Sequence, residues 1–227
     1  MAQVWHDLLF AHWPISPKLM RPLVPAELPL DLHGNQCWVG VVPFWMSRVR
    51  PRALPPVPAL SSFPELNVRT YVTVENKPGV FFFSLDAASR LAVWGARTFY
   101  HLPYFRARMS TGWAGDWVQY DSRRVNGTAE LQCRYQPDGP TFEAAPNTLE
   151  HFLTERYCLY TVSHGEVSRC DIHHAPWRLQ TATAEFMKNS VAAASAIELP
   201  ECAPHLLFSR RQEVIIWPLR EAKPRRR

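Results

Sequence analysis

Residues 65–71 carry polar side chains with the alternation of a β-strand. In Glu65-Leu-Asn-Val-Arg-Thr-Tyr71, every second side chain (Glu65, Asn67, Arg69, Tyr71) falls on one face of an extended chain. A buried carboxylate can act as a general acid or base, and a guanidinium can hold a carboxylate through two hydrogen bonds. Glu65 and Arg69 would lie about 13 Å apart along a straight strand, so each needs a partner from elsewhere. Taken alone, such a face is also typical of a solvent-facing antiparallel strand.

Further polar residues follow at short intervals. Ser84 and Asp86 share a face of the next expected strand, Arg97 falls late in the following helix, and Arg156 sits in Glu155-Arg-Tyr157 at a helix end. These side chains could converge on the mouth or lumen of a barrel, where buried charges mark function, or form an ion-pair lattice that holds helices onto the sheet. The residues themselves favour neither interpretation.

Strand patterns dominate the elements that must position these residues. Asn76-Lys-Pro-Gly79 predicts a hairpin turn, and Asn126-Gly127 predicts a type I′ hairpin turn. A proline-marked turn at residues 102–103 leads into a further strand. Short helices are expected at 16–23, at 86–100 with Asp86 as the cap, and from Asn147 or Thr148. Strands are expected at residues 36–46, 67–74, 80–85, 117–124, 128–135, 157–162, 167–174, 179–187 and 213–217. This order favours an α+β, β-rich barrel or sandwich.

The composition is typical of a soluble globular protein, and the charge and hydropathy patterns bear on whether it binds nucleic acid or a membrane. Apolar residues make up 47% and charged residues 20% of the 227 residues. Residues 218–227 carry +4 of the net charge of +5, which predicts a basic, disordered tail there. A boundary in the proline-rich stretch at 51–64 would leave a first piece of about 50 residues, near the lower limit for an independent core, so we expect one domain over 1–217. No basic face appears in the body, so we expect no nucleic-acid partner, and no apolar run is long enough for a membrane span.

Cysteine usage and missing motifs narrow the chemistry. Five cysteines without a C-x-x-C spacing predict free thiols in the cytoplasm rather than a disulfide framework or a zinc site. The neighbours His173 and His174 would point to opposite faces of a strand, so we expect no metal there. Dinucleotide, P-loop, zinc-protease and α/β-hydrolase motifs are absent, and no cofactor is expected. A stretch at 51–64 with five prolines predicts a long surface loop that could serve as a lid.

In combination, short motifs spread over residues 5–217 resemble the YqjF-like family of uncharacterised bacterial proteins, which is placed with the acetoacetate-decarboxylase-like superfamily. The motifs are 9–14 (LFAHWP), 43–44 (PF), 65–71 (ELNVRTY), 83–86 (FSLD), 96–97 (AR), 102–104 (LPY), 155–157 (ERY) and 174–177 (HxPW). The resemblance implies an acetoacetate-decarboxylase-like β-cone or barrel of mainly antiparallel strands, with a central cavity and a few short flanking helices.

The resemblance also bears on the reaction. In the decarboxylase branch, a lysine directly after a proline forms a Schiff base with a keto acid, assisted by a carboxylate and arginines. The matching place here is Leu102-Pro-Tyr104, and none of the four lysines falls there. The resemblance therefore implies no Schiff-base decarboxylation. It makes Glu65 and Arg69 the carboxylate and cation of the cavity, and puts Tyr104 in the place of the lysine, where a phenol can donate a hydrogen bond to a carbonyl.

The sequence is compatible with two alternative functions. The first is a cavity for a small organic acid or carbonyl compound, with lysine-independent lyase, hydratase or isomerase chemistry. Glu65 and Tyr104 would be catalytic, and the substrate would be held by Asn67, Arg69, Tyr71, Ser84, Arg97 and Arg156. The second is a non-catalytic small-molecule-binding or regulatory module, its cavity filled by aromatics such as Phe82, Trp94 and Trp117. The oligomeric state is left open, a homo-oligomer included.

Overall fold

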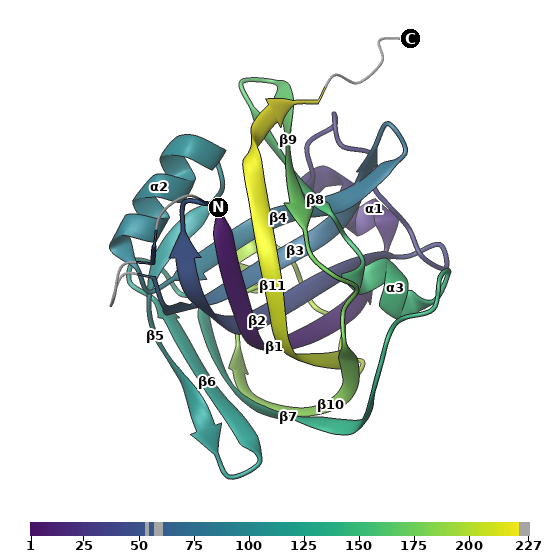
Figure 1. Ribbon diagram of the computed structural model, residues 1–227. Helices are drawn as coiled ribbons and strands as arrows, with labels where there is room; N and C mark the ends of the chain where they lie inside the picture. Colours follow the sequence, from purple (N-terminus) through teal and green to yellow (C-terminus); the bar gives the residue numbers. More distant parts are fainter. Residues whose placement is uncertain (53–54, 57–60, 223–227) are drawn as a thin grey trace.

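The computed structural model describes residues 1–52, 55–56 and 61–222, and strands dominate this part of the chain (Figure 1). The helices are short and lie at the outside of the sheet. They are α1 (Pro17–Met20), α2 (Arg90–Tyr100) and α3 (Leu149–Thr154), with 3₁₀ turns at Arg21–Leu23 and Ala193–Ser195. The strands are β1 (Ala2–Ile15), β2 (Cys37–Arg50), β3 (Phe63–Val74), β4 (Lys77–Ala87), β5 (Tyr104–Ala114), β6 (Trp117–Arg124), β7 (Glu130–Phe142), β8 (Cys158–Ser163), β9 (Glu166–His173), β10 (Leu179–Asn189) and β11 (His205–Glu221).

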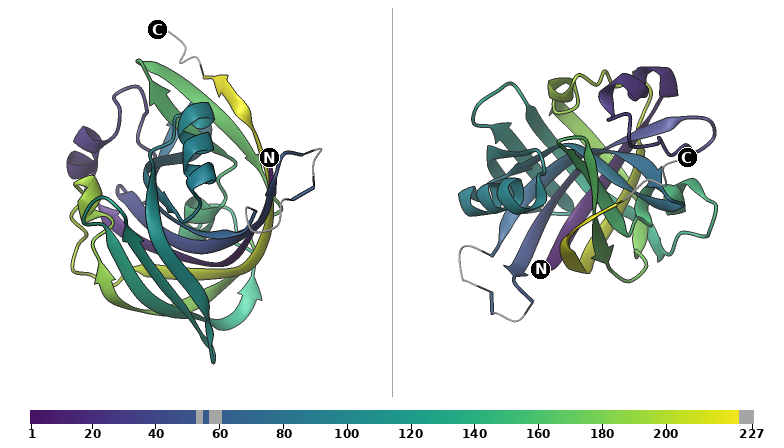
Figure 2. Two further views of the ribbon diagram at one scale, coloured as in Figure 1. Left: turned by 90° about the vertical axis from the view of Figure 1, so that its left-hand side faces the viewer. Right: turned by 90° about the horizontal axis from the view of Figure 1, so that it is seen from above.

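All of these strands belong to one sheet that closes on itself twice. The sheet runs β1-β2-β3-β4-β5-β6-β7-β10-β11-β9-β8, and further pairings join β1 to β11 and β4 to β8. Two rings result, which have β1–β4 and β11 in common (Figure 2). Pairing is antiparallel except where β4 meets β5 and β8. The expected β-rich, ring-like architecture is therefore confirmed.

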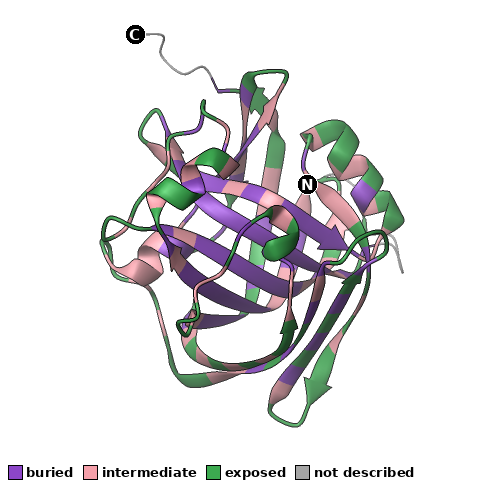
Figure 3. Ribbon diagram, turned by 180° about the vertical axis from the view of Figure 1, so that it is seen from behind, coloured by how far each residue is buried: buried purple, intermediate pink, exposed green. Residues whose placement is uncertain are grey.

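The strands common to both rings, β1–β4 and β11, form a wall with two different faces. Leu66 and Val68 of β3 join the larger packed core with Tyr120 and Tyr135 of β6 and β7. The alternate side chains of β3, beginning with Glu65, point into the other ring, which β8 and β9 complete. Most residues of β1–β4 are buried, and buried strands cross the middle of the view in Figure 3, whereas β11 carries exposed residues from Arg210 onward.

The two ends of the chain lie side by side in this wall. β1 was not anticipated from the sequence, and it pairs with β11 from Ala2↔Ile215 to His12↔His205. The expected strand at 213–217 is the middle of a much longer one, because β11 continues to Glu221 beside β9. The tail predicted to begin at residue 218 is thus wrong at its start, since 218–221 belong to the sheet. Residues 223–227 lie outside the described residues.

Two turns differ from their predictions in detail. β3 and β4 are joined by Glu75 and Asn76, both with φ near +55° (52° and 59°), so Lys77, Pro78 and Gly79 belong to β4 rather than to the turn. The hairpin around Asn126-Gly127 exists, but β6 ends at Arg124 and β7 begins at Glu130, so a longer loop replaces the two-residue type I′ turn. Only Gly127 has a positive φ there.

The helix after β4 begins later than predicted. Ser89, not Asp86, caps α2, with its side chain accepting from the Ala92 N–H. Asp86 is the penultimate residue of β4 and accepts two hydrogen bonds from Arg124, at 3.0 and 2.7 Å. α3 begins as predicted, with Thr148 as its cap. Of the loop and lid predicted for 51–64, residues 53–54 and 57–60 lie outside the described residues, and residues 63–64 belong to β3 instead.

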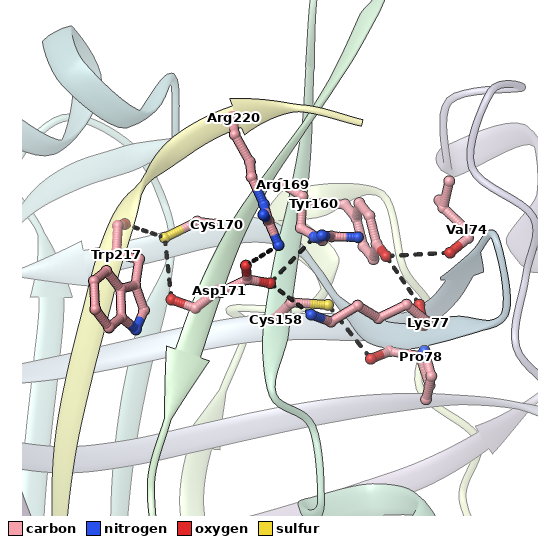
Figure 4. Close-up of polar contacts among 10 residues, drawn as sticks. All are labelled: Val74, Lys77, Pro78, Cys158, Tyr160, Arg169, Cys170, Asp171, Trp217 and Arg220. Carbon is pink, nitrogen blue, oxygen red and sulfur yellow. Dashed lines mark hydrogen bonds and ion pairs between the residues drawn. The ribbon is translucent and has the colours of Figure 1, made fainter. Parts of the chain in front are cut away.

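A polar cluster joins β4, β8, β9 and β11, where the pairing of β8 with β4 and of β9 with β11 closes the second ring (Figure 4). Asp171 binds Lys77 at 2.7 Å and Arg169 at 3.1 Å, and also pairs with Arg220. Burial acts to raise the pKa of Asp171, but the hydrogen bond and charge of Lys77 and the two arginine charges together lower it. A Cβ at Gly79 would lie 2.7 Å from the Cys158 sulfur, so β4 can approach β8 this closely only because residue 79 is glycine.

Candidate functional site in the second ring

An internal cavity of about 90 Å³ lies inside the ring that contains β8 and β9. That volume has room for roughly seven water-sized atoms, which suits a small organic molecule. Most of its wall is apolar, with side chains from the strands, from α2 and from the segment after it. The apolar lining includes Val42, Phe44, Val80, Phe82, Leu85, Leu102, Leu159, Ile172 and Ile216.

The polar part of the wall comes mainly from one face of β3. Glu65, Asn67 and Arg69 all line the cavity and are at most 9% exposed. β3 holds them in this order because it is paired along its length with β2 and β4. Tyr104, at the start of β5, and Arg156, just after α3, also line the cavity. The structure therefore brings together five of the eight residues singled out in the sequence.

Glu65 and Tyr104 form a short hydrogen bond inside the cavity. The Tyr104 hydroxyl donates to Glu65 Oε2 at 2.6 Å. Burial raises the pKa of Glu65 to about 7, against a lowering by the Tyr104 hydrogen bond and a further rise from the charge of Asp86. Burial, with the neighbouring Glu65, holds the pKa of Tyr104 well above its ordinary value, so the phenol stays protonated. At neutral pH the pair can therefore both accept and donate a proton.

Arg69 is a buried cation without a carboxylate partner among the described residues. Its Nη2 donates to the Leu153 carbonyl at 3.2 Å, and its guanidinium lies 5.4 Å from the Phe10 ring. Its Nε is buried and makes no hydrogen bond in the described part of the protein, and the same holds for Oδ1 of Asn67. Buried polar groups are nearly always hydrogen-bonded, so this stretch of wall is incomplete without a further partner.

Arg156 differs from Arg69 because its charge is already balanced. It pairs with Asp31 at 2.5 Å, and its Nε donates to the Phe152 carbonyl at 2.6 Å. Its guanidinium also lies over the rings of Phe152 and Tyr71, at 4.2 and 4.8 Å. Arg156 therefore closes one end of the cavity rather than presenting a free charge.

The other three predicted residues lie outside the cavity lining. Tyr71 is behind it, with its hydroxyl donating to the Leu153 carbonyl at 2.8 Å and receiving a hydrogen bond from His12 at 2.6 Å. Ser84 is buried opposite Val68 and so faces away. Arg97 is exposed on α2 and donates to the Tyr104 carbonyl at 2.6 Å. For Ser84, alternation could not foresee the placement because the β3–β4 register shifts between Val68 and Arg69, which puts Ser84 and Phe82 on opposite faces of β4.

Sequence reasoning missed two aromatic residues of the site. His174 and Trp177 line the cavity and are 5% and 3% exposed, and the Trp177 indole N–H has no partner among the described residues. The His174 ring is held by its Nδ1, which donates to the Ala175 carbonyl at 2.8 Å, and Gln212 Nε2 lies 3.2 Å from the same nitrogen. The sequence did predict that His173 and His174 point to opposite faces, and in the structure only His174 is buried. Of the aromatics proposed to fill the cavity, Phe82 lines it, whereas Trp94 is 62% exposed and Trp117 lies under Arg134.

The described residues offer neither a lysine in the lining nor a cluster of three or more metal-binding side chains. Lys77 and Lys188 are engaged with Asp171 and Glu130, away from the cavity. Within the described ranges, no helix is long and apolar enough to cross a membrane.

The fold is that of acetoacetate-decarboxylase-like proteins. The enduracididine biosynthesis enzyme MppR in complex with pyruvate superposes with a TM-score of 0.69 at 10% identity, over 98% of this chain and 90% of that one. Acetoacetate decarboxylase from Legionella pneumophila gives 0.68 at 10% identity, over 99% and 88% of the two chains. An acetoacetate decarboxylase-like enzyme from Sphingomonas wittichii RW1 gives 0.63 at 12% identity, over 98% and 93%.

Within this fold, the chain belongs to the family DUF2071, described as an uncharacterized conserved protein, whose model matches residues 2–213. It is 48% identical over 222 residues to the uncharacterized protein YqjF of Bacillus subtilis, covering 97% of this chain and 92% of that protein. The family resemblance drawn from the sequence motifs is thereby confirmed.

Proposed function

We propose that this protein binds a small organic acid or carbonyl compound in the cavity, and that Glu65 transfers protons on it without a lysine while Tyr104 hydrogen-bonds to the ligand oxygen. The main support for this proposal is the environment of Arg69. A buried guanidinium with no carboxylate partner in the described protein is costly to keep, and a ligand carboxylate would supply the missing countercharge and hydrogen bond. The apolar wall opposite suits the carbon skeleton of such a ligand.

The chemistry that fits this pair is enolisation, a step common to lyases, hydratases and isomerases. The Glu65 carboxylate would take a proton from the carbon beside a ligand carbonyl, and the electron pair of that C–H bond would move onto the carbonyl oxygen. Tyr104 would shift its hydrogen bond from Glu65 to this oxygen and stabilise the negative charge. A carboxylate whose pKa lies near 7 is well matched to both taking and returning the proton.

Binding is tested by calorimetry with a panel of small acids that includes pyruvate, which one structural neighbour holds. We expect wild type to bind one or more of them and Arg69→Met to bind at least tenfold more weakly with unchanged folding. Arg134→Met is the matched control, because Arg134 is exposed and far from the cavity lining. Equal ligand affinity in the two variants would show that Arg69 does not bind the ligand.

Turnover is tested by the exchange of ligand C–H protons in D₂O, followed by NMR. We expect wild type to catalyse exchange of a bound acid, and Glu65→Gln to retain binding but lose exchange. Binding without exchange in wild type would favour the alternative, a non-catalytic binding or regulatory module.

We also place the protein in the cytoplasm. Cys37, Cys133, Cys158 and Cys170 are buried free thiols, and Cys202 is exposed and free. Free cysteines of this kind are typical of a reducing compartment.

A further inference from the structure

A second concave site lies on the outer side of the wall that encloses the cavity. It is an open groove of about 620 Å³ across β2, β1, β11 and the end of β9. Arg211, Glu213 and Ile215 of β11 line the groove and are not part of the cavity lining, to which Ile216 of the same strand contributes. Gln3 and His174 contribute to both linings, which shows that one wall separates the two sites.

The groove concentrates positive charge. Among the described residues, its lining contains four arginines and a single acid, Glu213, which pairs with Arg211 at 2.5 Å. The arginines are Arg48, Arg50, Arg178 and Arg211. The groove therefore carries a formal +3, whereas residues 1–217 as a whole carry only +1. The excess is local and creates an attractive potential for anions in a concave surface.

Two of these arginines have unoccupied guanidinium groups. In the described part of the chain, the side chains of Arg48 and Arg178 make neither a hydrogen bond nor an ion pair, although both line the same groove. Arg48 also has a φ of +54°, a left-handed conformation that non-glycine residues seldom adopt. It sits where the register between β1 and β2 shifts, and such bulges redirect a side chain.

Two arginines of the groove also act on His6. The pKa of His6 is lowered chiefly by burial; the charge of Asp7 opposes this lowering, and the smaller effects of Arg211 and Arg48 add to it. Arg48 and Arg211, from different strands, thus act on one point beside the groove.

We propose that this groove is an anion site for a small molecule that carries a phosphate or diphosphate group. Guanidinium groups match phosphate oxygens in pairs, and several separated arginines suit an extended dianion better than a single carboxylate. The lining also contains the apolar side chains of Ala2, Val4 and Ile215, and among the described residues His173 and His174 are the only aromatic side chains that line the groove. Single-stranded nucleic acid relies on aromatic stacking, which this lining does not offer.

The test is calorimetry with inorganic diphosphate. We expect wild type to bind and the double variant Arg48→Gln/Arg178→Gln to bind at least tenfold more weakly. The control variant Arg106→Gln/Arg108→Gln removes the same charge from exposed positions of β5 outside the groove and should stay within twofold of wild type. Both variants change exposed side chains, and thermal melting should show unchanged stability.

Three results would overturn the proposal. One is equal weakening in both double variants, which would mean attraction by net charge alone. Another is equal affinity for succinate, which would remove the preference for phosphate. The last is no binding of diphosphate together with RNA binding that strengthens with oligonucleotide length. The cavity variant Arg69→Met should leave diphosphate binding unchanged, so failure here is separate from failure of the proposed function.

Discussion

Two buried carboxylates on neighbouring strands, Glu65 and Asp86, face different environments. Asp86 accepts two hydrogen bonds from a buried arginine, whereas Glu65 has only a phenol. Burial raises the pKa of both, and for Glu65 the result is a value of about 7. The sequence singled out Glu65 as a candidate acid or base, but Tyr104 was singled out through a family resemblance and not from spacing, since the two residues are 39 positions apart.

At the residue scale, we predict that Glu65→Gln becomes more stable relative to wild type as the pH rises. The folded state holds the Glu65 proton up to about pH 7 and the unfolded chain releases it near 4.5, so wild type loses stability between these values. A shift of this size corresponds to about 3 kcal/mol. Urea unfolding at pH 5 and pH 8.5 should show the gap opening by an amount of that order.

The control for this measurement is Glu185→Gln on the exposed face of β10. Its stability difference from wild type should be nearly the same at both pH values. A pH-independent gap for Glu65→Gln would mean that Glu65 is ionised in the folded protein throughout this range.

At the scale of elements, buried and exposed ion pairs join strands with very different energies. Arg124 of β6 binds Asp86 of β4, and both side chains are under 10% exposed, whereas Arg134 and Glu185 join β7 to β10 at about half exposure. Arg124 also lies 3.8 Å from the Phe105 ring. The Arg124–Asp86 pair therefore connects β4, one of the strands common to both rings, to the β5–β6 hairpin.

We predict that Arg124→Met destabilises the protein by about 3–5 kcal/mol, because Asp86 would be left buried without its cation. Arg134→Met should cost less than about 1 kcal/mol, as expected for an exposed pair. Chemical denaturation at pH 7 measures both. Similar losses in the two variants would contradict a special role for the buried pair.

Turns and caps show why element boundaries were harder to predict than the elements. The type I′ turn formed at Glu75-Asn76, where a glutamate accepts φ of 52°, and not at the Asn-Gly dipeptide. Asp86 and Ser89 are both good helix caps by type, but the pairing of β4 with β5 extends the strand past Asp86 to Ala87. Local residue preferences indicated the possible turn and cap positions, and strand pairing determined which of them were used.

At the scale of the whole molecule, the two rings cannot be separated. They have β1–β4 and β11 in common, and β1 and β11 come from opposite ends of the chain. Neither ring can be completed before both ends have been brought together. Such long-range pairing is typical of slow folding, in milliseconds to seconds.

We therefore predict a single cooperative unfolding transition. Far-UV circular dichroism and tryptophan fluorescence should give superimposable denaturation curves, since Trp5 and Trp177 report on the cavity ring and Trp113 and Trp117 on the other. Two separated transitions would show that one ring can open while the other stays folded.

The sequence by itself determined the strand-rich class, most strand positions, the missing lysine and the polar face of β3. Those features depend on neighbouring residues, on alternation and on composition, which are local properties. It also determined that Leu66 and Val68 would face opposite to Glu65, Asn67 and Arg69, because extended chains alternate.

Only the tertiary structure decided which polar residues meet. The register shift in β4 turned Ser84 away, α2 left Arg97 in solvent, and Asp31 neutralised Arg156 from 125 residues away, so that Arg69 alone presents a buried charge without a carboxylate in the described protein. The pairing of β1 with β11 likewise decided that four arginines would share one groove. Long-range pairing depends on the energy of the whole sheet, which no single segment carries.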